Sequence, residues 1–340
     1  MSEINVLYPF DNNYAPYAGI SLTSLLENNI SANGIHVFIL GFSLTRETED
    51  KFRRTVKKYD RDITFIEAKP VEDFIQGLNM PSYRGACIAA ARLFVSRFIP
   101  DSIKRLLYLD SDTVVVGDIT PLIDSNLKGN AVGMVCDSVG RDYKKVHGFG
   151  VDDEYYNGGM ILYDLPKWKE LKCSKRIEEH ILSVRNQYEA LDQDLINIVL
   201  KGQITKLDLK YNLQPFHLVY SPEMYLRIYG DRGYYTEEEI KSATAAPAIL
   251  HAFRYLGMFP WHRDSVHPCV DLFDKYRSLS EWEEFEPIEL KNDPIMIRIE
   301  RLLNRILPAG LFLRIFRFVF RIRMGIIERK IHKGKTYVNI

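Results

Sequence analysis

The sequence predicts an α/β protein with one mainly parallel, mixed sheet and a basic helical tail at its C-terminal end. Short apolar runs suited to buried strands alternate with segments whose apolar residues recur at helical spacing. Acidic residues directly follow two of these runs, as in open sheets that bind ligands beyond the carboxyl ends of their strands. Neither an internal repeat nor a low-complexity tract interrupts the 340 residues.

The predicted elements alternate in the order expected of βαβ units. The predicted strands are Ile4–Tyr8, Ile35–Leu40, Ile63–Ile66, Arg105–Leu109, Ala131–Cys136 and Met160–Tyr163. The predicted helices are Tyr17–Leu26, Arg46–Tyr59, Ala89–Phe98, Ser174–Val184 and Asp194–Leu200. A segment bounded by Pro287 and Pro294 predicts a boundary between a body of residues 1–287 and a tail of residues 288–340.

Charge is distributed unevenly between the body and the tail. The chain has 45 basic and 45 acidic side chains, and a net charge of zero gives no support for a nucleic-acid-binding protein. From Arg298 to Lys335, however, there are eleven Lys and Arg residues and two Glu residues, a net charge of +9 that leaves −9 on residues 1–297. This asymmetry indicates a basic interaction tail on an enzyme or binding domain.

The four cysteines, Cys87, Cys136, Cys173 and Cys269, lie far apart and have no metal-ligand spacing. They are typical of free thiols in a reducing compartment rather than of a disulfide framework. The first residues lack the basic and apolar regions of a signal peptide, and no run of about 18 uncharged apolar residues predicts a transmembrane helix. We therefore expect a cytoplasmic body.

An acidic pair, Asp110 and Asp112, stands among apolar β-forming residues in the segment Arg105–Gly117. In a continuing strand both carboxylates would point to one face, where they repel each other unless a cation or water intervenes. A divalent cation that also binds a substrate diphosphate meets this need and would neutralise charge on a departing phosphate. The alternative is a solvated turn, because Asp and Ser favour turns. Spacing alone leaves both interpretations open.

Six ordered blocks of sequence resemble the retaining glycosyltransferase family 8, which includes glycogenin and the bacterial lipo-oligosaccharide galactosyltransferases. The blocks are FDNNYAPY (10–17), AARLFVSRFIP (90–100), LYLDSDTVVVGDITPL (107–122), YYNGGMILYDL (155–165), LDQDLIN (191–197) and the stretch from His251 to Asp264. The resemblance extends roughly over residues 4–285. It implies a GT-A-type, Rossmann-like nucleotide-binding domain and a hexosyltransferase that retains the anomeric configuration of its donor.

The resemblance also implies positions for the donor and for a metal ion. The residues that match the family's contacts to the nucleotide, its phosphates and the donor sugar are Asp11, Asn13, Tyr14, Arg92, Asp110 and Gly257. The residues that match ligands of a Mn²⁺ or Mg²⁺ ion are Asp110, Asp112 and His251. A neutral imidazole suits a borderline cation better than a third carboxylate would. Without the surrounding blocks, Tyr14 and His251 would be interpreted as core residues and Arg92 as a surface arginine.

Four further positions match the family's catalytic pocket, namely Asp137, Asn157, Asp192 and Gln193. Asp192 would hydrogen-bond sugar hydroxyls, Gln193 would lie beneath the anomeric carbon, and the glycines after Asn157 would let backbone approach the sugar or else form a turn before a strand. A neutral amide is a poor nucleophile. We therefore expect same-face displacement, in which the departing UDP phosphate takes the acceptor's proton and Gln193 stabilises an oxocarbenium-like transition state.

One segment departs from the family's usual pattern, His-x-x-Gly-x-x-Lys-Pro-Trp, in which the lysine binds the diphosphate. Here five residues separate His251 from Gly257, and Phe259 stands before Pro260 in place of the lysine. Other side chains must then neutralise the negative charge of the phosphates. The candidates are Arg254, His262 and Arg263.

The tail segment Leu311–Ile327 combines arginines with large apolar residues. At helical spacing Arg314, Arg317 and Arg321 share one face, and the apolar residues Phe312, Phe316, Val319 and Phe320 spread over the rest. This pattern is typical of an interfacial helix on an anionic membrane, so we expect the protein at the inner face of the cell membrane. The alternative is a helix packed on the body or on a second subunit.

The whole sequence predicts transfer of glucose or galactose from UDP-glucose or UDP-galactose to a glycan acceptor, with Mn²⁺ or Mg²⁺. That acceptor would be lipopolysaccharide, capsule or a lipid-linked oligosaccharide. Two alternatives stay open: a protein O-glucosyltransferase, and an inactive scaffold that binds a UDP-sugar or glycan. A dinucleotide-dependent enzyme is disfavoured, because no GxGxxG motif follows the first strand.

Overall fold

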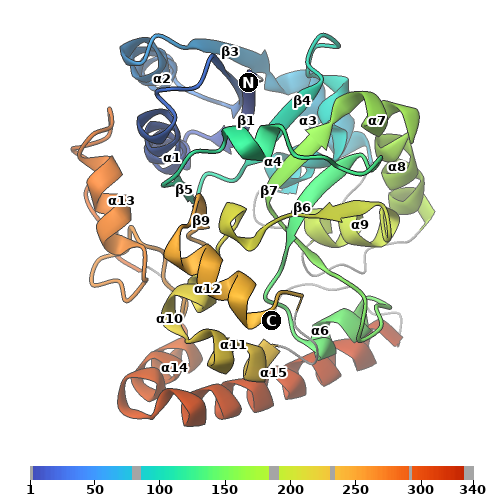
Figure 1. The fold of residues 1–340 in the computed structure, drawn as a ribbon, viewed down its shortest axis with the longest axis vertical. Coiled ribbons are helices and arrows are strands. Elements are labelled where there is room, and N and C mark those ends of the chain that lie inside the picture. The colour runs from blue at the N-terminus through green and yellow to red at the C-terminus, as the bar shows by residue number, and fades with distance from the viewer. Residues whose placement is uncertain (1–2, 79–85, 184–190, 230–233, 291–292, 333–340) are drawn as a thin grey trace.

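The computed structural model describes residues 3–78, 86–183, 191–229, 234–290 and 293–332 (Figure 1). The strands are β1 (Ile4–Asp11), β2 (Ile35–Phe42), β3 (Asp62–Glu67), β4 (Arg105–Leu109), β5 (Thr113–Val115), β6 (Val132–Cys136), β7 (Tyr156–Asp164), β8 (Ile204–Lys206) and β9 (Ile249–His251). Two 3₁₀ helices are η1 (Ala91–Arg97) and η2 (Leu209–Tyr211).

The α-helices within the described ranges fall into those of the body and those of the tail. The helices of the body are α1 (Ala15–Asn28), α2 (Arg46–Lys58), α3 (Ala68–Gly77), α4 (Ala86–Ala90), α5 (Thr120–Ile123), α6 (Arg141–Val146), α7 (Leu165–Glu170), α8 (Cys173–Ser183), α9 (Leu191–Val199), α10 (Pro215–Val219), α11 (Pro222–Tyr229), α12 (Glu237–Ala245) and α13 (Val270–Arg277). The helices of the tail are α14 (Ile295–Ile306) and α15 (Ala309–His332).

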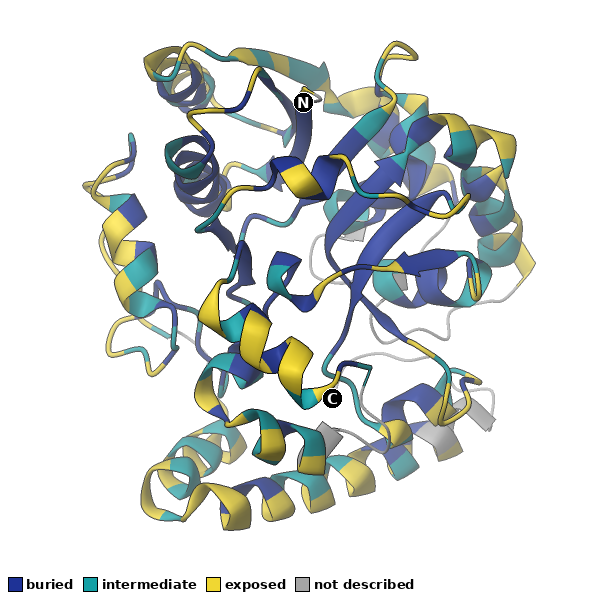
Figure 2. Ribbon diagram, viewed as in Figure 1, coloured by how far each residue is buried: buried dark blue, intermediate teal, exposed yellow. Residues whose placement is uncertain are grey.

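The main sheet has the strand order β3-β2-β1-β4-β7-β6-β8. Every neighbouring pair is parallel except those of β7, which runs antiparallel to both β4 and β6. The predicted mainly parallel, mixed sheet is therefore confirmed. Its central strands are buried along most of their length, and exposed residues lie on the outer surfaces of the helices (Figure 2). Continuous apolar strands suit a sheet that is covered on both faces.

Two predicted elements differ from the observed ones. The single helix expected over Ala89–Phe98 is instead the end of α4 followed by the 3₁₀ helix η1, which is interrupted at Phe94 (φ −127°, ψ 23°). The strand expected at Met160–Tyr163 is β7, which begins earlier, so that Asn157 and the two following glycines lie on the strand. A bulge sits there, because the partner on β7 shifts from Ile161 to Asn157 between consecutive residues of β6.

The chain turns after Asp110 and does not continue as one strand through the acidic pair; the sequence analysis left a continuing strand and a turn both open. Strand β4 ends at Leu109, the chain turns at Ser111 and Asp112, and β5 then enters a separate two-stranded sheet with β9. In that sheet Thr113 is the register partner of His251. The two carboxylates are thus brought to His251 by a turn between two sheets and not by the alternation of one strand.

The described part of the tail forms two helices, and α15 packs on α6 and α11 of the body (Figure 1). One side of α15 is buried, with Phe312, Leu313, Met324 and Ile327 each at most 3% exposed. The alternative of a tail helix packed on the body therefore holds for this side, while the opposite side is exposed. No helix among the described residues is long and apolar enough to cross a membrane. Val184 and residues 333–340 lie outside the described residues.

A buried histidine ties the segment after β9 to α13. His267 Nε2 donates to the carbonyl oxygen of Phe253 over 2.9 Å, and its Nδ1 accepts from the backbone N–H of Cys269 over 3.1 Å. This pair of bonds requires the neutral ring. Burial lowers the pKa of His267 from 6.5 to about 4, against the opposing effect of its bond to Phe253.

We predict that His267 contributes to acid sensitivity. The unfolded chain takes up a proton near pH 6.5 that the folded protein takes up only near pH 4, so stability is lost as pH falls through this window. Over this pH range, the titration of His267 alone should lower the free energy of unfolding by about 3 kcal/mol. Urea unfolding at several pH values should show a shallower decline for His267→Gln, which does not titrate. Parallel curves would contradict the prediction.

Candidate active site

A cavity of about 510 Å³ opens at the carboxyl ends of β4 and β6. Its lining contains eight of the predicted site residues: Arg92, Asp110, Asp112, Asp137, Asn157, Asp192, Gln193 and His251. The lining also includes residues of α6, Phe216 and Phe253, and Phe316, Arg317 and Phe320 of α15. Segments far apart in the sequence, including the tail, therefore meet around one space.

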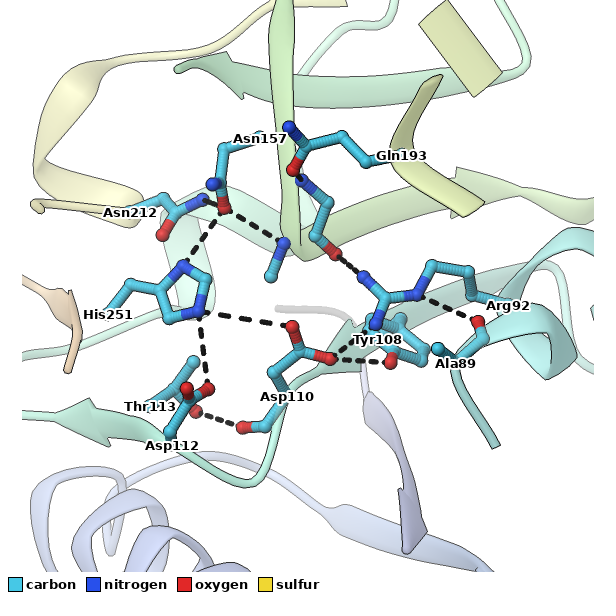
Figure 3. Close-up of polar contacts among 12 residues, drawn as sticks. Ala89, Arg92, Tyr108, Asp110, Asp112, Thr113, Asn157, Gln193, Asn212 and His251 are labelled. Carbon is cyan, nitrogen blue, oxygen red and sulfur yellow. Dashed lines mark hydrogen bonds and ion pairs between the residues drawn. The ribbon is translucent and has the colours of Figure 1, made fainter. Parts of the chain in front are cut away.

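Asp110, Asp112 and His251 form one cluster in the lining of this cavity. His251 Nε2 lies 3.2 Å from Asp112 Oδ1 and 3.9 Å from Asp110 Oδ2. One ligand atom from each of the three residues lies within 4.8 Å of the other two. Figure 3 shows the imidazole turned toward both carboxylates, with Asp110 between His251 and Arg92. Two oxygen ligands and one nitrogen ligand in this arrangement fit a divalent cation such as Mn²⁺.

The orientation of His251 is fixed by Asn157. The side-chain oxygen of Asn157 accepts from the backbone N–H of Gly159 and from the side-chain amide of Asn212, each over 2.9 Å. It also lies 2.9 Å from His251 Nδ1, so that Nδ1 carries the proton and donates. Nε2 then presents its lone pair to the cavity. An imidazole whose other nitrogen donates to a fixed oxygen is the usual arrangement of a metal-binding histidine.

The charges in this cluster are coupled to one another. Burial tends to lower the pKa of His251, but Asp112 and Asp110 outweigh burial and raise it. Burial tends to raise the pKa of Asp112, but the charge of His251 and a hydrogen bond to it lower it below its ordinary value. The pKa of Asp110 is raised, chiefly by burial. His251 and the two carboxylates therefore shift one another's pKa, at a position where a divalent ion would also offset the negative charge.

Arg92 contacts the cluster on the side of Asp110 away from His251, and it is only 6% exposed. Its guanidinium donates to Asp110 Oδ1 over 2.7 Å and lies 2.9 Å from Asp192 Oδ2. The hydroxyl of Tyr108 donates to the same Asp110 oxygen over 2.6 Å. Burial by itself would lower the pKa of Arg92, but the charges of Asp110 and Asp192 outweigh burial and raise this pKa. The arginine is thus a buried bridge between two predicted site residues.

The side-chain amide of Gln193 is held at both ends. Its oxygen accepts from the backbone N–H of Gly158 over 2.8 Å, and its nitrogen donates to Asp137 Oδ2 over 2.7 Å. Burial raises the pKa of Asp137, although the hydrogen bond from Gln193 partly opposes this effect. Asp137, Asn157 and Gln193 therefore form one polar floor beside the acidic cluster.

The glycines of the bulge make room for side chains of the site. A Cβ atom at Gly159 would lie 1.9 Å from His251 Cε1, and one at Gly158 would lie 2.8 Å from Arg92 Nη1. Glycine at position 159 therefore lets His251 approach the backbone of β7, and a side chain at position 158 would displace the guanidinium of Arg92. The sequence analysis expected these glycines to admit a sugar, and the structure adds this packing requirement.

Four predicted residues do not line the cavity: Asp11, Asn13, Tyr14 and Gly257. Asp11 ends β1, and its Oδ1 accepts from the backbone N–H groups of Asn13 and Tyr14, each over 3.0 Å, which shapes the following turn. Tyr14 is 45% exposed at the start of α1. Gly257 has φ +79° and packs against α14, where a Cβ atom would lie 2.3 Å from Ile297. Their predicted contacts to the donor stay predictions.

The altered segment after His251 forms an aromatic stack. Phe259 stacks on Trp261 with ring centroids 4.4 Å apart, and Trp261 stacks on Tyr17 at 3.9 Å. None of the three candidate replacements for the lysine lines the cavity. The guanidinium of Arg254 lies over Phe259, Arg263 pairs with Glu289, and His262 Nδ1 accepts from the backbone N–H of Phe259.

Several residues of the site were not found from the sequence. Asn212 and Tyr108 orient Asn157 and Asp110, yet each stands in an ordinary polar or strand context that gives no signal. Asp194 is fully buried and accepts from the hydroxyls of Tyr143 and Tyr155. It follows Gln193 closely in the block LDQDLIN, so its proximity to the site was visible but its role as an anchor for α6 was not.

Comparison with known families bears directly on this arrangement. The model of glycosyl transferase family 8 matches residues 5–265, which include the whole cluster described above. The chain belongs to this family. It is therefore a glycosyltransferase, as the resemblance implied.

Two relatives similar to this chain are named as lipopolysaccharide glycosyltransferases. Lipopolysaccharide 1,2-glucosyltransferase of Escherichia coli (strain K12) is 27% identical over 293 residues, 85% of this chain and 82% of the relative. Lipopolysaccharide 1,3-galactosyltransferase of Salmonella typhimurium (strain LT2) is 27% identical over 292 residues, 82% of this chain and 79% of the relative.

A solved structure of galactosyltransferase LgtC, in complex with donor and acceptor sugar analogues, aligns with a TM-score of 0.66 at 23% identity. The alignment covers 87% of this chain and 99% of LgtC. The predicted GT-A-type fold is thereby confirmed.

We predict that Gly159→Ala will displace His251 and weaken binding of Mn²⁺ at least about tenfold, because the new methyl group and the imidazole cannot occupy the same space. Isothermal titration with Mn²⁺ measures the affinity, and circular dichroism checks that the fold persists. Gly77→Ala is the matched control, since no atom lies within 4 Å of the added Cβ. Unchanged Mn²⁺ affinity in a folded Gly159→Ala protein would refute the role of His251.

Proposed function

We propose that the protein transfers glucose or galactose from a UDP-sugar to a glycan acceptor with retention of configuration. The observation that carries the proposal is the cluster of Asp110, Asp112 and His251, which lies beside Arg92 and Gln193 in one cavity of a family 8 chain. The names of the two lipopolysaccharide hexosyltransferases support a hexose as the transferred sugar. They include both a glucosyltransferase and a galactosyltransferase, so both donors belong to the proposal.

Binding of the donor would use two groups of residues. Asp110, Asp112 and His251 would hold a Mn²⁺ or Mg²⁺ ion, which when bound neutralises charge on the diphosphate. The turn of Asp11, Asn13 and Tyr14 would hold the ribose and uracil, with the exposed ring of Tyr14 available for stacking. Such a ring can stack on a base.

The sugar itself would lie over the polar floor of the cavity. Asp192, held by Arg92, would accept hydrogen bonds from sugar hydroxyls. Gln193 would lie below the anomeric carbon with its amide fixed by Gly158 and Asp137. Because both ends of this amide are already held, its carbonyl dipole is preorganised to stabilise positive charge that develops on the sugar.

Retention would follow from same-face displacement. The bond from the anomeric carbon to the UDP oxygen breaks, the acceptor oxygen attacks from the same face, and the departing phosphate takes the acceptor's proton. A neutral amide is a poor nucleophile, and ordinary retaining glycosidases use a carboxylate for a covalent step. Trapping a covalent glycosyl adduct on the protein would refute this route.

Two other functions are separated from this one by simple assays. An inactive scaffold would bind the UDP-sugar without turnover; its support is the absence of a lysine before Pro260. A protein O-glucosyltransferase would transfer the hexose to a Ser, Thr or Tyr hydroxyl. Labelled sugar in protein rather than in glycan would identify it.

We predict slow hydrolysis of UDP-glucose or UDP-galactose that requires Mn²⁺ and is abolished by EDTA. Asp112→Asn should reduce the rate at least about 100-fold, because a neutral amide is a weaker ligand and no longer offsets the cation's charge. Asp118→Asn, at an exposed carboxylate outside the cavity, is the matched control. Release of UDP measures the rate. Donor binding without metal-dependent turnover in the wild type would support the scaffold instead.

We further propose that the tail places the enzyme on the cytoplasmic face of a membrane. On α14 the apolar side chains Ile295, Ile299, Leu302 and Ile306 recur at helical spacing and are 42–73% exposed. The segment from Arg298 to Lys335 carries a net charge of +9. An exposed apolar face within a basic segment complements a membrane with anionic lipids.

We predict binding to vesicles that contain phosphatidylglycerol, weakened by salt. The double variant Ile299→Glu/Leu302→Glu should bind at least about tenfold less well, because burial of each side chain contributes about 1.5–3 kcal/mol. Ile30→Glu, at an apolar side chain 64% exposed outside the tail, is the matched control. Vesicle co-sedimentation measures binding. If the wild type instead forms dimers that the double variant abolishes, without binding vesicles, the face is a subunit interface.

A further inference from the structure

We propose that Arg141 of α6 and Arg317 of α15 bind an anionic group of the acceptor, a phosphate or a carboxylate. Both arginines line the same cavity as the acidic cluster. The acceptor is accordingly an acidic glycan rather than a neutral one. This inference rests on the proposed hexosyltransferase function and adds to it the charge of the acceptor and two residues that select it.

Three carboxylates of the cavity lining have partners within the site itself. The guanidinium of Arg92 lies 2.7 Å from Asp110 and 2.9 Å from Asp192. Asp112 Oδ1 lies 3.2 Å from His251 Nε2. These three carboxylates would also face the donor and its cation. They are therefore compensated by groups other than the two arginines of α6 and α15.

The other two carboxylates of the lining have partners as well. Asp137 accepts a hydrogen bond from Gln193, and burial raises the pKa of Asp137. Asp142 Oδ2 accepts from Arg321 Nε over 3.4 Å, and Arg321 is not part of the lining. Each carboxylate of the lining thus has a partner other than Arg141 and Arg317. An anion that enters the cavity would meet both guanidinium groups without first displacing these partners.

Arg141 is the clearer of the two binding groups. It is the first residue of α6 and is exposed. Among the residues that the structure describes, no hydrogen-bond or ion-pair partner contacts its side chain. A guanidinium offers five donors in a planar fork that matches the oxygens of a phosphate or a carboxylate. Arg141 can therefore bind such a group without breaking a contact within the protein.

Arg317 is held beside the cavity by a neutral group. Its Nη1 donates to the carbonyl oxygen of Arg227, at the end of α11, over 3.2 Å. This bond orients the guanidinium and does not neutralise its charge. Helices α6 and α15 pack against each other (Figure 1), and the ion pair of Asp142 with Arg321 joins them one residue after Arg141 and one turn after Arg317. Adjoining segments therefore supply both guanidiniums to one cavity.

The donor has other positions in this cavity. The acidic cluster would hold its diphosphate through the cation, and the polar floor would face its sugar. No donor contact is assigned to α6 or α15. Phe316 and Phe320 of α15 line the cavity with Arg317 between them in sequence. Aromatic rings suit the apolar faces of sugars, and guanidiniums suit an anionic substituent, so this combination suits an acidic acceptor.

The experiment measures binding of one soluble glycan in a charged and a neutral form. The charged form is the core oligosaccharide released by mild acid from rough-type lipopolysaccharide, with its phosphate and carboxylate groups intact. In the neutral form, hydrogen fluoride has removed the phosphates and the carboxyls have been reduced to alcohols. Mn²⁺ and UDP are present throughout, so that the acidic cluster is filled and the phosphates of the glycan do not bind there. Isothermal titration measures the affinity.

The wild type should bind the charged form at least about tenfold more tightly than the neutral form, because the two arginines form charge-assisted hydrogen bonds only with the former. Arg141→Gln/Arg317→Gln should lose this preference and keep its affinity for the neutral form and for UDP with Mn²⁺. Arg314→Gln, at an exposed arginine of α15 outside the lining, is the matched control. Forms of the glycan that lack only phosphates or only carboxylates identify which anion is bound.

Arg141→Gln alone separates anion binding from packing, because this side chain is exposed. It should weaken binding of the charged form at least about threefold and leave binding of the neutral form unchanged. Equal affinity of the wild type for both forms, or binding of neither, would overturn the inference. Weaker binding of both forms by the variants would show a merely structural role, and weaker binding of UDP would assign the arginines to the donor diphosphate. Either result would also overturn it.

Failure of the proposed function gives a different result. The absence of metal-dependent UDP-sugar hydrolysis in the wild type would refute hexosyl transfer, and it is measured before any glycan is added. The binding experiment needs no turnover, so its outcome is read independently of that assay.

Discussion

Two carboxylates that share a partly buried site must be compensated by positive charge, and the rest of this structure is arranged around that requirement. Arg92 pairs with Asp110 on one side, and His251 faces Asp110 and Asp112 on the other. Asn157 leaves His251 with a lone pair directed at the carboxylates. The same cluster can therefore be stabilised by a proton on the imidazole or by a divalent cation, and a cation would also attract a diphosphate.

The fold supplies these groups from elements that would otherwise be unrelated. Asp110 directly follows strand β4, and Asp112 lies in the turn that leads into the small β5–β9 sheet. His251 is the last residue of β9. The bulged, antiparallel strand β7 supplies Asn157 and the glycine backbone against which the imidazole fits. A site assembled in this way depends on backbone geometry as much as on the ligands.

The sequence predicted the sheet class and most strands because buried strands are continuous apolar runs, and Arg105–Leu109 was predicted to the residue. It did not predict the break at Phe94, and it left open whether the chain turns between Asp110 and Thr113, since both features depend on tertiary packing. Eight of the predicted site residues meet in the cavity. The sequence did not show that Phe316 and Phe320 line the cavity, because helical periodicity does not tell which face of a helix meets a distant pocket.

The central claim is that Asp110, Asp112 and His251 together hold a divalent cation at which the donor diphosphate binds. Anomalous diffraction from a crystal grown with Mn²⁺ and UDP tests it most directly, because manganese is located independently of the protein. The account predicts one strong peak within bonding distance of all three side chains, with a phosphate oxygen of UDP completing its ligands. UDP bound in the cavity without a peak there, or with manganese at other residues, would contradict it.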